Sequence, residues 1–346
     1  MRFSADGATS IDLHIHETVC FSQHRDNIAV FAEWVSDPFS DLNVRLWPKG
    51  SNIRKIAALI AEDRPDLIVV HQHLPTASHL SRIFRETPVV LVRHNFQKAP
   101  RNRISRILKQ RQMARFAEIA FVSECCREDF HRHWPGVTVP VSVLLNGVDE
   151  TRWKPAIVKD PLILFVGRLA PEKGALEAAT AMAEAVRERA DWSGRMIVSS
   201  DPDHAGYARQ VERVVAGTQG RIELMRDVGH DTVRHWMGRA SISLAPTRNR
   251  EPFGRVAVEA LASGAVVVAS ARGGFVEIVG ESGVLLDTPD AVPLAAAVKD
   301  LIDDEGKRLR LAAAGRDRVV PRYTLATTAA IFDALVDKHC TGGVTP

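Results

Sequence analysis

Two glutamates and a glycine lie in a segment whose residue types suit a sugar phosphate. The segment Arg248 to Gly264 reads RNREPFGRVAVEALASG and follows the short apolar run SISLAP. Glu251 lies in the predicted loop, and Glu259 lies eight residues further on, inside the predicted helix. Gly254 lets the backbone come close to a ligand, and the N–H groups of a helix N-terminus attract an anion. The alternative is a solvated loop glutamate followed by an ordinary helical glutamate.

A second loop carries two cations. The strand expected at 162–167 runs into VGRLAPEKG, in which Arg168 and Lys173 lie on either side of a tight turn. Fixed cations stabilise the charge that develops on a diphosphate leaving group, and they do so without a metal. Ligands bind beyond the carboxyl ends of parallel strands, so we expect this loop to lie beside the EPFG loop. An exposed Arg and Lys on a surface turn is the competing interpretation.

Two more strand ends offer contacts to a ligand. Val228 lies in the turn after the strand 221–225, where backbone amides and carbonyls can contact a nucleobase without selecting uracil or guanine. His94 closes the strand 88–94, where we expect it to face an interdomain cleft and to stabilise a sugar hydroxyl near the reacting carbon. A buried, hydrogen-bonded structural histidine is the other interpretation of His94.

Two H-x-H pairs suggest a different class of enzyme. His14 and His16 lie in the first expected strand, and His71 and His73 close a neighbouring one. On a strand this spacing puts both imidazoles on one face, as zinc sites of metal-dependent hydrolases do. A metal-dependent hydrolase is therefore the alternative. We predict no metal and no cofactor, because no Asp or Glu cluster accompanies the pairs and the second half of the chain would have no role.

The segment 97–116 carries seven basic residues and no acidic one. Ile104, Ile107 and Leu108 share one face of the helix that its periodicity predicts, with basic residues around them. Such a segment can lie on anionic lipid or hold an acidic acceptor, or it can be an ordinary solvated face. Nucleic acid is not predicted as a partner, because the net charge is only +3 and no aromatic residues interleave the basic ones.

Short apolar strands alternate with helical patterns along both halves of the 346 residues. This alternation predicts an α/β fold with two Rossmann-like, doubly wound units. We expect an N-terminal domain at 1–153, a C-terminal domain at 154–323 and a final helix in 324–346 that crosses back to the first domain. The expected strands are 11–17, 43–47, 66–72, 88–94, 118–123, 141–146, 162–167, 195–199, 221–225, 241–245 and 265–270.

The composition is that of a soluble globular protein, with 45% hydrophobic and 25% charged residues. The four cysteines, Cys20, Cys125, Cys126 and Cys340, have no metal-ligand or disulfide-framework spacing. The N-terminus has no apolar stretch of signal-peptide type, and no run approaches the roughly 18 apolar residues of a membrane span. We therefore expect a cytoplasmic protein whose only membrane contact is peripheral, at the inner face, through 97–116.

Three motifs together resemble one family. LLNGVD (144–149), VGRLAPEKG and EPFGRVAVEALASGAVVVAS resemble the retaining glycosyltransferases of the GT-B fold, family 4 type, over residues 144 to 290. The resemblance implies two Rossmann-like domains that face each other across a cleft. It also implies transfer of a hexose from a nucleotide-diphosphate sugar to a glycan or lipid-linked acceptor, without a metal, in cell-surface polysaccharide or lipopolysaccharide biosynthesis. A non-catalytic sugar-nucleotide-binding protein is a further alternative.

The resemblance also implies roles for single residues. Glu251 contacts the donor sugar, Glu259 contacts the ribose hydroxyls and His94 lies near the anomeric centre. The side chains of Arg168 and Lys173 hold the diphosphate. The backbone amides of Phe253, Gly254 and Arg255 assist them. One departure concerns the glycine-rich loop that follows the first strand in such enzymes. Here the stretch 17–27 reads ETVCFSQHRDN and holds no glycine, which leaves its role on the acceptor side open.

Overall fold

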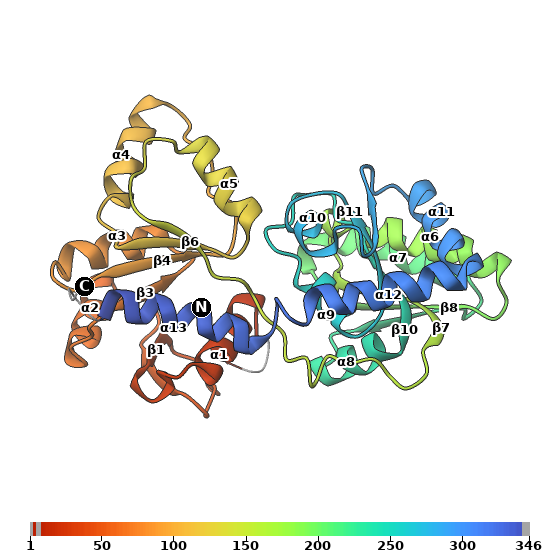
Figure 1. The fold of residues 1–346 in the computed structure, drawn as a ribbon, viewed down its shortest axis with the longest axis horizontal. Coiled ribbons are helices and arrows are strands. Elements are labelled where there is room, and N and C mark those ends of the chain that lie inside the picture. The colour runs from red at the N-terminus through yellow and green to blue at the C-terminus, as the bar shows by residue number, and fades with distance from the viewer. Residues whose placement is uncertain (1–2, 5–7, 341–346) are drawn as a thin grey trace. The chain divides into compact units, whose positions relative to one another are not determined.

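The chain forms two compact units, in a computed structural model that describes residues 3–4 and 8–340 (Figure 1). The first unit comprises Met1–Gly147 together with Leu325–Pro346, and the second comprises Val148–Thr324. The sequence analysis expected these two divisions after residues 153 and 323. The segment Trp153–Asp160 belongs to the second unit, where the Ala156 amide donates to the Gly238 carbonyl at 3.0 Å.

The second unit is an open sheet of six parallel strands in the order β12-β11-β10-β7-β8-β9. The strands are β7 (Asp160–Arg168), β8 (Ser193–Ser199), β9 (Ile222–Arg226), β10 (Ala240–Ala245), β11 (Val266–Ser270) and β12 (Val284–Leu286). Side chains of the central strands, such as Ile163, Leu244 and Val268, are fully buried. Burial on both faces explains why these strands read as continuous apolar runs.

Helices connect these strands. They are α6 (Ala175–Glu188), α7 (Ala205–Ala216), α8 (His230–Arg239), α9 (Arg255–Ala262), α10 (Gly274–Val279), α11 (Ala291–Asp303) and α12 (Glu305–Val319), with 3-10 turns η2 (Pro171–Lys173) and η3 (Pro202–His204). The strand order reverses between β7 and β10, which are neighbours in the sheet. In sheets of this kind the loops that follow the two strands at such a reversal form the ligand site.

The first unit holds a four-stranded parallel sheet, β3-β4-β5-β6, and a separate parallel pair, β1-β2. The strands are β1 (Ala29–Glu33), β2 (Asn43–Trp47), β3 (Ile68–His71), β4 (Val89–Arg93), β5 (Glu118–Phe121) and β6 (Val141–Val143). The helices are α1 (Ser10–Phe21), α2 (Ile53–Glu62), α3 (Leu74–Ile83), α4 (Arg103–Met113), α5 (Glu124–His133) and α13 (Leu325–Cys340), with the 3-10 turn η1 (Arg25–Asn27). The predicted α/β class with parallel sheets is confirmed.

The prediction of a strand at 11–17 is wrong, because these residues belong to helix α1. Thr9 caps the helix through a reciprocal box, in which its side chain accepts from the Asp12 amide and its own amide donates to Asp12 Oδ2 at 2.9 Å. Ile15 and Val19, four residues apart, are both buried, as a helix face requires. The alternating pattern of IDLHIHE therefore hid a capped helix.

Because α1 is a helix, residues 17–27 also occupy a different place in the fold from the one predicted. These residues form the end of α1 and the turn η1, and they precede β1 instead of following a strand. The comparison with a glycine-rich loop was therefore made at the wrong place in the fold. The segment that leads into α1 includes residues 5–7, which lie outside the described residues.

Helix α13 belongs to the first unit and packs against α1. The Ser22 hydroxyl donates to the Asp333 carboxylate, and the Gln23 amide donates to it at 3.1 Å. Near the C-terminal end of the helix, Lys338 Nζ lies 2.7 Å from Oε2 of the buried Glu118. Buried carboxylates thus fix the middle of α13 to the end of α1 and its last turn to β5.

Candidate active site

The loop after β7 is held against the end of β10 by a glycine. Gly174 has a φ of 70°, and a Cβ there would lie 2.1 Å from the Pro246 carbonyl oxygen. Only glycine tolerates both conditions. The Thr247 hydroxyl and the Arg248 amide each donate to the Glu172 carbonyl, at 2.7 and 2.9 Å. The VGRLAPEKG and EPFG loops therefore lie side by side, as the sequence analysis expected.

The EPFG loop is fixed from its other side by the loop after β11. The Gly274 amide donates to the Glu251 carbonyl at 2.7 Å, and a Cβ at Gly273 would lie 2.1 Å from that carbonyl oxygen. Gly254 has a φ of 105° and forms the N-cap of α9 without a side chain to occupy the first turn. Backbone of the EPFG loop is thus held rigidly where the N–H groups of α9 begin, which is a geometry that favours an anion.

Lys173 and Glu251 form an ion pair across these two loops. Nζ of Lys173 lies 2.8 Å from Oε2 of Glu251, and their side chains are 31% and 19% exposed. Both side chains are therefore partly buried yet accessible to a ligand. The pair joins the cation proposed for a diphosphate to the carboxylate proposed for a sugar.

Arg168, at the end of β7, is held by two carboxylates. Its guanidinium pairs with Glu172 and lies 3.2 Å from Asp201, which follows β8. Val228 lies after β9, at the other side of the sheet from the EPFG loop, and it is half-buried. The residue before it, Asp227, has a φ of 50° and accepts from the Ser200 amide at 2.8 Å. The turn that contains Val228 is thus tied to the loop after β8.

Glu259 lies one turn inside α9 and is paired with Arg255. Nε of Arg255 lies 2.8 Å from Oε1 of Glu259, and the two side chains are 14% and 10% exposed. Only the backbone amide of Arg255 was predicted to contact the donor, and the role of its side chain beside Glu259 was not predicted. The i,i+4 spacing of the two residues was a signal that could have revealed the pair.

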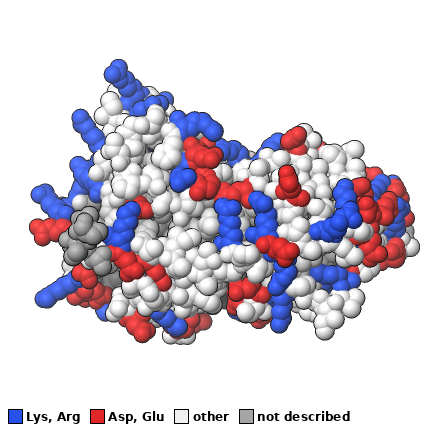
Figure 2. Space-filling model, viewed as in Figure 1, with Lys and Arg blue, Asp and Glu red and all other residues white. Residues whose placement is uncertain are grey.

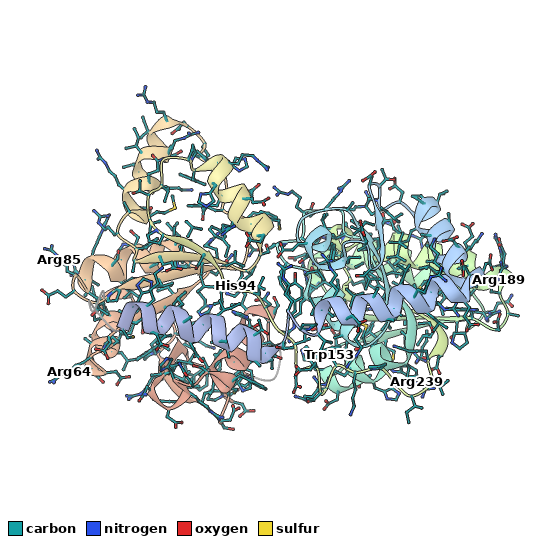
Figure 3. All side chains as sticks on the ribbon, in the orientation of Figure 1. Arg64, Arg85, His94, Trp153, Arg189 and Arg239 are labelled. Carbon is teal, nitrogen blue, oxygen red and sulfur yellow. The ribbon has the colours of Figure 1, made fainter. Side chains whose placement is uncertain are left out.

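His94 belongs to the first unit, where it follows β4 (Figure 3). Its Nε2 lies 3.0 Å from Nδ1 of His71, which ends the neighbouring strand β3. Its amide donates to the Gln72 side chain at 3.0 Å. The His14 ring of α1 lies 5.1 Å from the His94 ring. Three histidines from three elements therefore surround one point beyond the end of β4.

His71 and His94 are neutral near pH 7. Burial lowers the pKa of His71 to about 4. Burial, followed by the nearby His14, His71 and Arg93, holds the pKa of His94 well below its ordinary value. A neutral imidazole can donate or accept a hydrogen bond to a sugar hydroxyl without adding charge.

The prediction that H-x-H pairs share strand faces is wrong. His14 and His16 lie on a helix, where residues two apart point to different sides. His16 pairs with Asp41, at 2.8 Å, whereas His14 lies by His71 and His94. His73 lies beyond the end of β3 and caps α3, where its side chain accepts a hydrogen bond from the Thr76 amide. Neither pair therefore presents two imidazoles on one strand face, which was the basis of the metal-dependent hydrolase alternative.

Helix α4 shows its apolar residues to solvent. Ile104, Leu108 and Ile107 are 71%, 55% and 41% exposed, and their spacing on α4 puts them on one face of the helix, as predicted. Figure 2 shows Lys and Arg side chains gathered over the part of the surface where α4 lies. Among helices of residues 3–4 and 8–340, none is long and apolar enough to cross a membrane.

Comparisons with known proteins agree with this architecture. Residues 160–304 match the family model described as glycosyl transferases group 1, and residues 14–152 match that of glycosyltransferase family 4. Anabaena HepE, solved in complex with UDP, superposes with a TM-score of 0.81 at 18% identity, covering 97% of this chain and 98% of HepE. The two units are thus Rossmann-like domains of the GT-B type.

Two curated relatives support the same family. A glycogen synthase of Mycobacterium tuberculosis is 33% identical over 207 residues, which are 56% of this chain and 47% of that protein. A D-inositol 3-phosphate glycosyltransferase of Corynebacterium kroppenstedtii is 27% identical over 251 residues, 65% of this chain and 54% of that protein. The chain spans about half the length of these relatives. It belongs to the GT-B glycosyltransferases of family 4 type.

Proposed function

We propose that this protein transfers a hexose from a nucleotide-diphosphate sugar to a glycan or lipid-linked acceptor, with retention of configuration. The observation that carries the proposal is the Lys173–Glu251 pair at 2.8 Å, on two loops that glycines hold together at the reversal of the strand order. A cation and a carboxylate so close together suit a ligand with adjoining phosphate and hydroxyl groups. A sugar diphosphate is such a ligand.

Each residue of the site has a proposed role. Lys173 and Arg168 bind the diphosphate and stabilise the charge that develops on it as the bond to the sugar breaks. Glu251 accepts hydrogen bonds from the donor sugar, and Glu259 accepts them from the ribose. The backbone supplies further contacts. The amides of Phe253, Gly254 and Arg255 donate to the phosphates, and the amide of Val228 contacts the base.

The step we propose is a front-side substitution. The acceptor oxygen bonds to the anomeric carbon as the bond from that carbon to the diphosphate oxygen breaks. The acceptor proton passes to the departing phosphate oxygen, which therefore serves as the base. A pair of glycosidase-type carboxylates is not required, and neither is a metal. His94, as a neutral imidazole, hydrogen-bonds a donor hydroxyl near the anomeric carbon.

The complexes of similar structures support uracil as the donor base. Structures of Anabaena HepE, similar in fold, are complexes with UDP and with UDP-glucose. A thermal-shift panel of UDP-, GDP- and ADP-sugars tests the donor, because a ligand of the native state raises its melting temperature. We expect one nucleotide class to raise it, and we expect Lys173→Ala to abolish that rise.

Transfer itself separates an enzyme from a sugar-nucleotide-binding protein that does no chemistry. When the protein is incubated with the donor identified in this way and with a cell-envelope extract that supplies the acceptor, we expect it to release nucleoside diphosphate. Glu251→Ala should abolish this release, whereas the exposed Glu281→Ala should leave it unchanged. Donor binding without any release, or near-normal turnover in Glu251→Ala, would overturn the proposal.

We further propose that α4 holds the protein at the inner, cytoplasmic face of a membrane, where a lipid-linked acceptor for cell-surface polysaccharide or lipopolysaccharide is found. The support is the exposed Ile104 and Leu108 with basic neighbours on the same helix. We expect cosedimentation with phosphatidylglycerol vesicles that weakens in Leu108→Asp. The control is Leu309→Asp on α12, which is equally exposed at 58%. Equal loss in both variants would contradict a specific role of α4.

A further inference from the structure

A cluster on the first unit joins three side chains that bind transition metals. His16 and Cys20 are four residues apart on α1, so the helix turns both to one side. Asp41 lies in the segment between β1 and β2 and reaches the same side. The ligand atoms of the three residues lie within 4.8 Å of one another. None of these residues has a part in the proposed transfer reaction.

The distances in this cluster resemble the edges of a metal tetrahedron. Sγ of Cys20 lies 3.6 Å from Nε2 of His16 and 3.4 Å from Oδ2 of Asp41. Zinc bonds of about 2.3 Å to sulfur and about 2.0–2.1 Å to nitrogen or oxygen give tetrahedral edges from sulfur of roughly 3.5–3.6 Å. The edge from Nε2 to Oδ2 is 2.8 Å, a hydrogen bond that would open by roughly 0.5 Å around an ion.

We propose that His16, Cys20 and Asp41 bind a divalent transition-metal ion of the zinc class, with a fourth position open to water. On binding, the Cys20 thiol loses its proton to solvent, and the metal bonds to Sγ, Nε2 and a carboxylate oxygen, releasing all of its hydration waters except the one at the fourth position. The thiolate and the carboxylate then balance the two positive charges of the ion. This combination of soft, borderline and hard ligands suits zinc better than calcium or magnesium.

The surroundings support such a site. The Phe39 ring stacks on His16, with centroids 4.1 Å apart and planes at 22°, and this contact fixes the orientation of the imidazole. A solvent-open hollow of about 540 Å³ is lined by Asp41 together with Ser22 and Arg25. It gives a hydrated ion a path to the carboxylate.

A second histidine cluster is the weaker candidate. His14, His71 and His94 also offer ligand atoms within 4.8 Å of one another. That cluster includes no carboxylate or thiolate. Two positive charges placed there would remain unbalanced. The metal is therefore assigned to the cluster that supplies anions.

The consequence is a metal clip between α1 and the segment that joins β1 to β2. In the absence of metal these parts are joined by an apolar cluster that includes Ile15, Val19 and Phe39, and by the His16–Asp41 pair, whose side chains are 21% and 48% exposed. Pairs so exposed contribute little to stability. An ion that binds only the folded state would add its binding free energy to the stability of this unit.

Cobalt titration of the full-length, chelator-treated protein tests the proposal. We expect one equivalent of Co²⁺ to bind with a thiolate-to-cobalt charge-transfer band, and zinc to displace it. Cys20→Ser should abolish the band, and Asp41→Asn should weaken binding at least tenfold. Zinc should raise the melting temperature of the wild type by several degrees and leave that of Cys20→Ser unchanged.

The chain supplies a matched control. His24 and Asp337 form another pair at 2.8 Å, with side chains 26% and 52% exposed, so His24→Asn should bind cobalt as the wild type does. Absence of binding by the wild type would overturn the proposal. A band that persists in Cys20→Ser and disappears in Cys340→Ser would also overturn it, because the exposed Cys340 would then be the thiolate.

Discussion

Nζ of Lys173 lies 2.8 Å from Oε2 of Glu251, although 78 residues separate them in the chain. The contact exists because β7 and β10 are neighbours, and because Gly174 lets the first loop touch the backbone at Pro246. Two loops that were interpreted separately in the sequence thus share one ion pair. The relationship also predicts how the two residues respond to substitution.

We expect Lys173→Ala and Glu251→Gln each to reduce kcat/KM by at least about 100-fold, the usual effect of removing one charged group that stabilises a transition state. The double variant should lose less than the product of the two, because the residues contact each other. Steady-state kinetics of the four proteins measure this coupling. Strict additivity would mean that the pair does not act as a unit.

Gly254→Ala should destabilise the second unit by about 1–3 kcal/mol, because a φ of 105° strains alanine. Its Cβ would also lie 2.6 Å from the Phe275 ring, so the EPFG loop must shift and donor affinity should fall. Gly206→Ala is the control, because a Cβ there meets nothing within 4 Å. Urea unfolding and donor titration test both variants, and an unchanged Gly254→Ala would contradict the rigid loop.

The pH dependence of stability should report His71. Its folded pKa of about 4 lies below the ordinary 6.5, so the unfolded chain binds a proton first as the pH falls. Stability is fully present above pH 6.5 and is lost between 6.5 and 4, by up to about 3 kcal/mol. His71→Asn should remove this part of the loss in urea unfolding, and the exposed His79→Asn should not. Equal slopes for wild type and His71→Asn would refute the assignment.

Glu118 should anchor helix α13. Burial alone would raise the pKa of this carboxyl, but hydrogen bonds from Lys338, Ser142 and His339 outweigh it and lower the pKa. Its contribution is therefore present above the ordinary carboxyl pKa and is lost as the pH falls through the lowered value.

Glu118→Gln should cost about 1–2 kcal/mol, since a buried carboxylate loses its charge beside the solvent-exposed cation of Lys338 and the hydrogen-bonded ring of His339. It should also speed amide hydrogen exchange in α13. Glu188→Gln, which alters a surface pair with Lys299 on the second unit, should change neither quantity. Unchanged exchange in α13 would show that Glu118 does not hold the helix.

The sequence alone determined the α/β class and pointed to the VGRLAPEKG and EPFG loops as the candidate site. Continuous apolar runs such as LILFVG have one stable environment, a parallel sheet covered on both faces, so most strands could be located by pattern. The short strands β1 and β12 were missed, because three to five residues carry too little pattern. The capped helix α1 was mistaken for a strand, because I, L and I alternate with polar residues over a few positions.

Tertiary structure decided which of those residues meet. Strand order brought Lys173 to Glu251, and the helical geometry of α1 sent His14 toward His71 and His16 toward Asp41. The H-x-H and cysteine patterns were ambiguous because ligand geometry depends on how elements far apart in the chain are packed together. Local residue spacing determines the faces of a helix or strand, whereas the contacts between those faces depend on the fold.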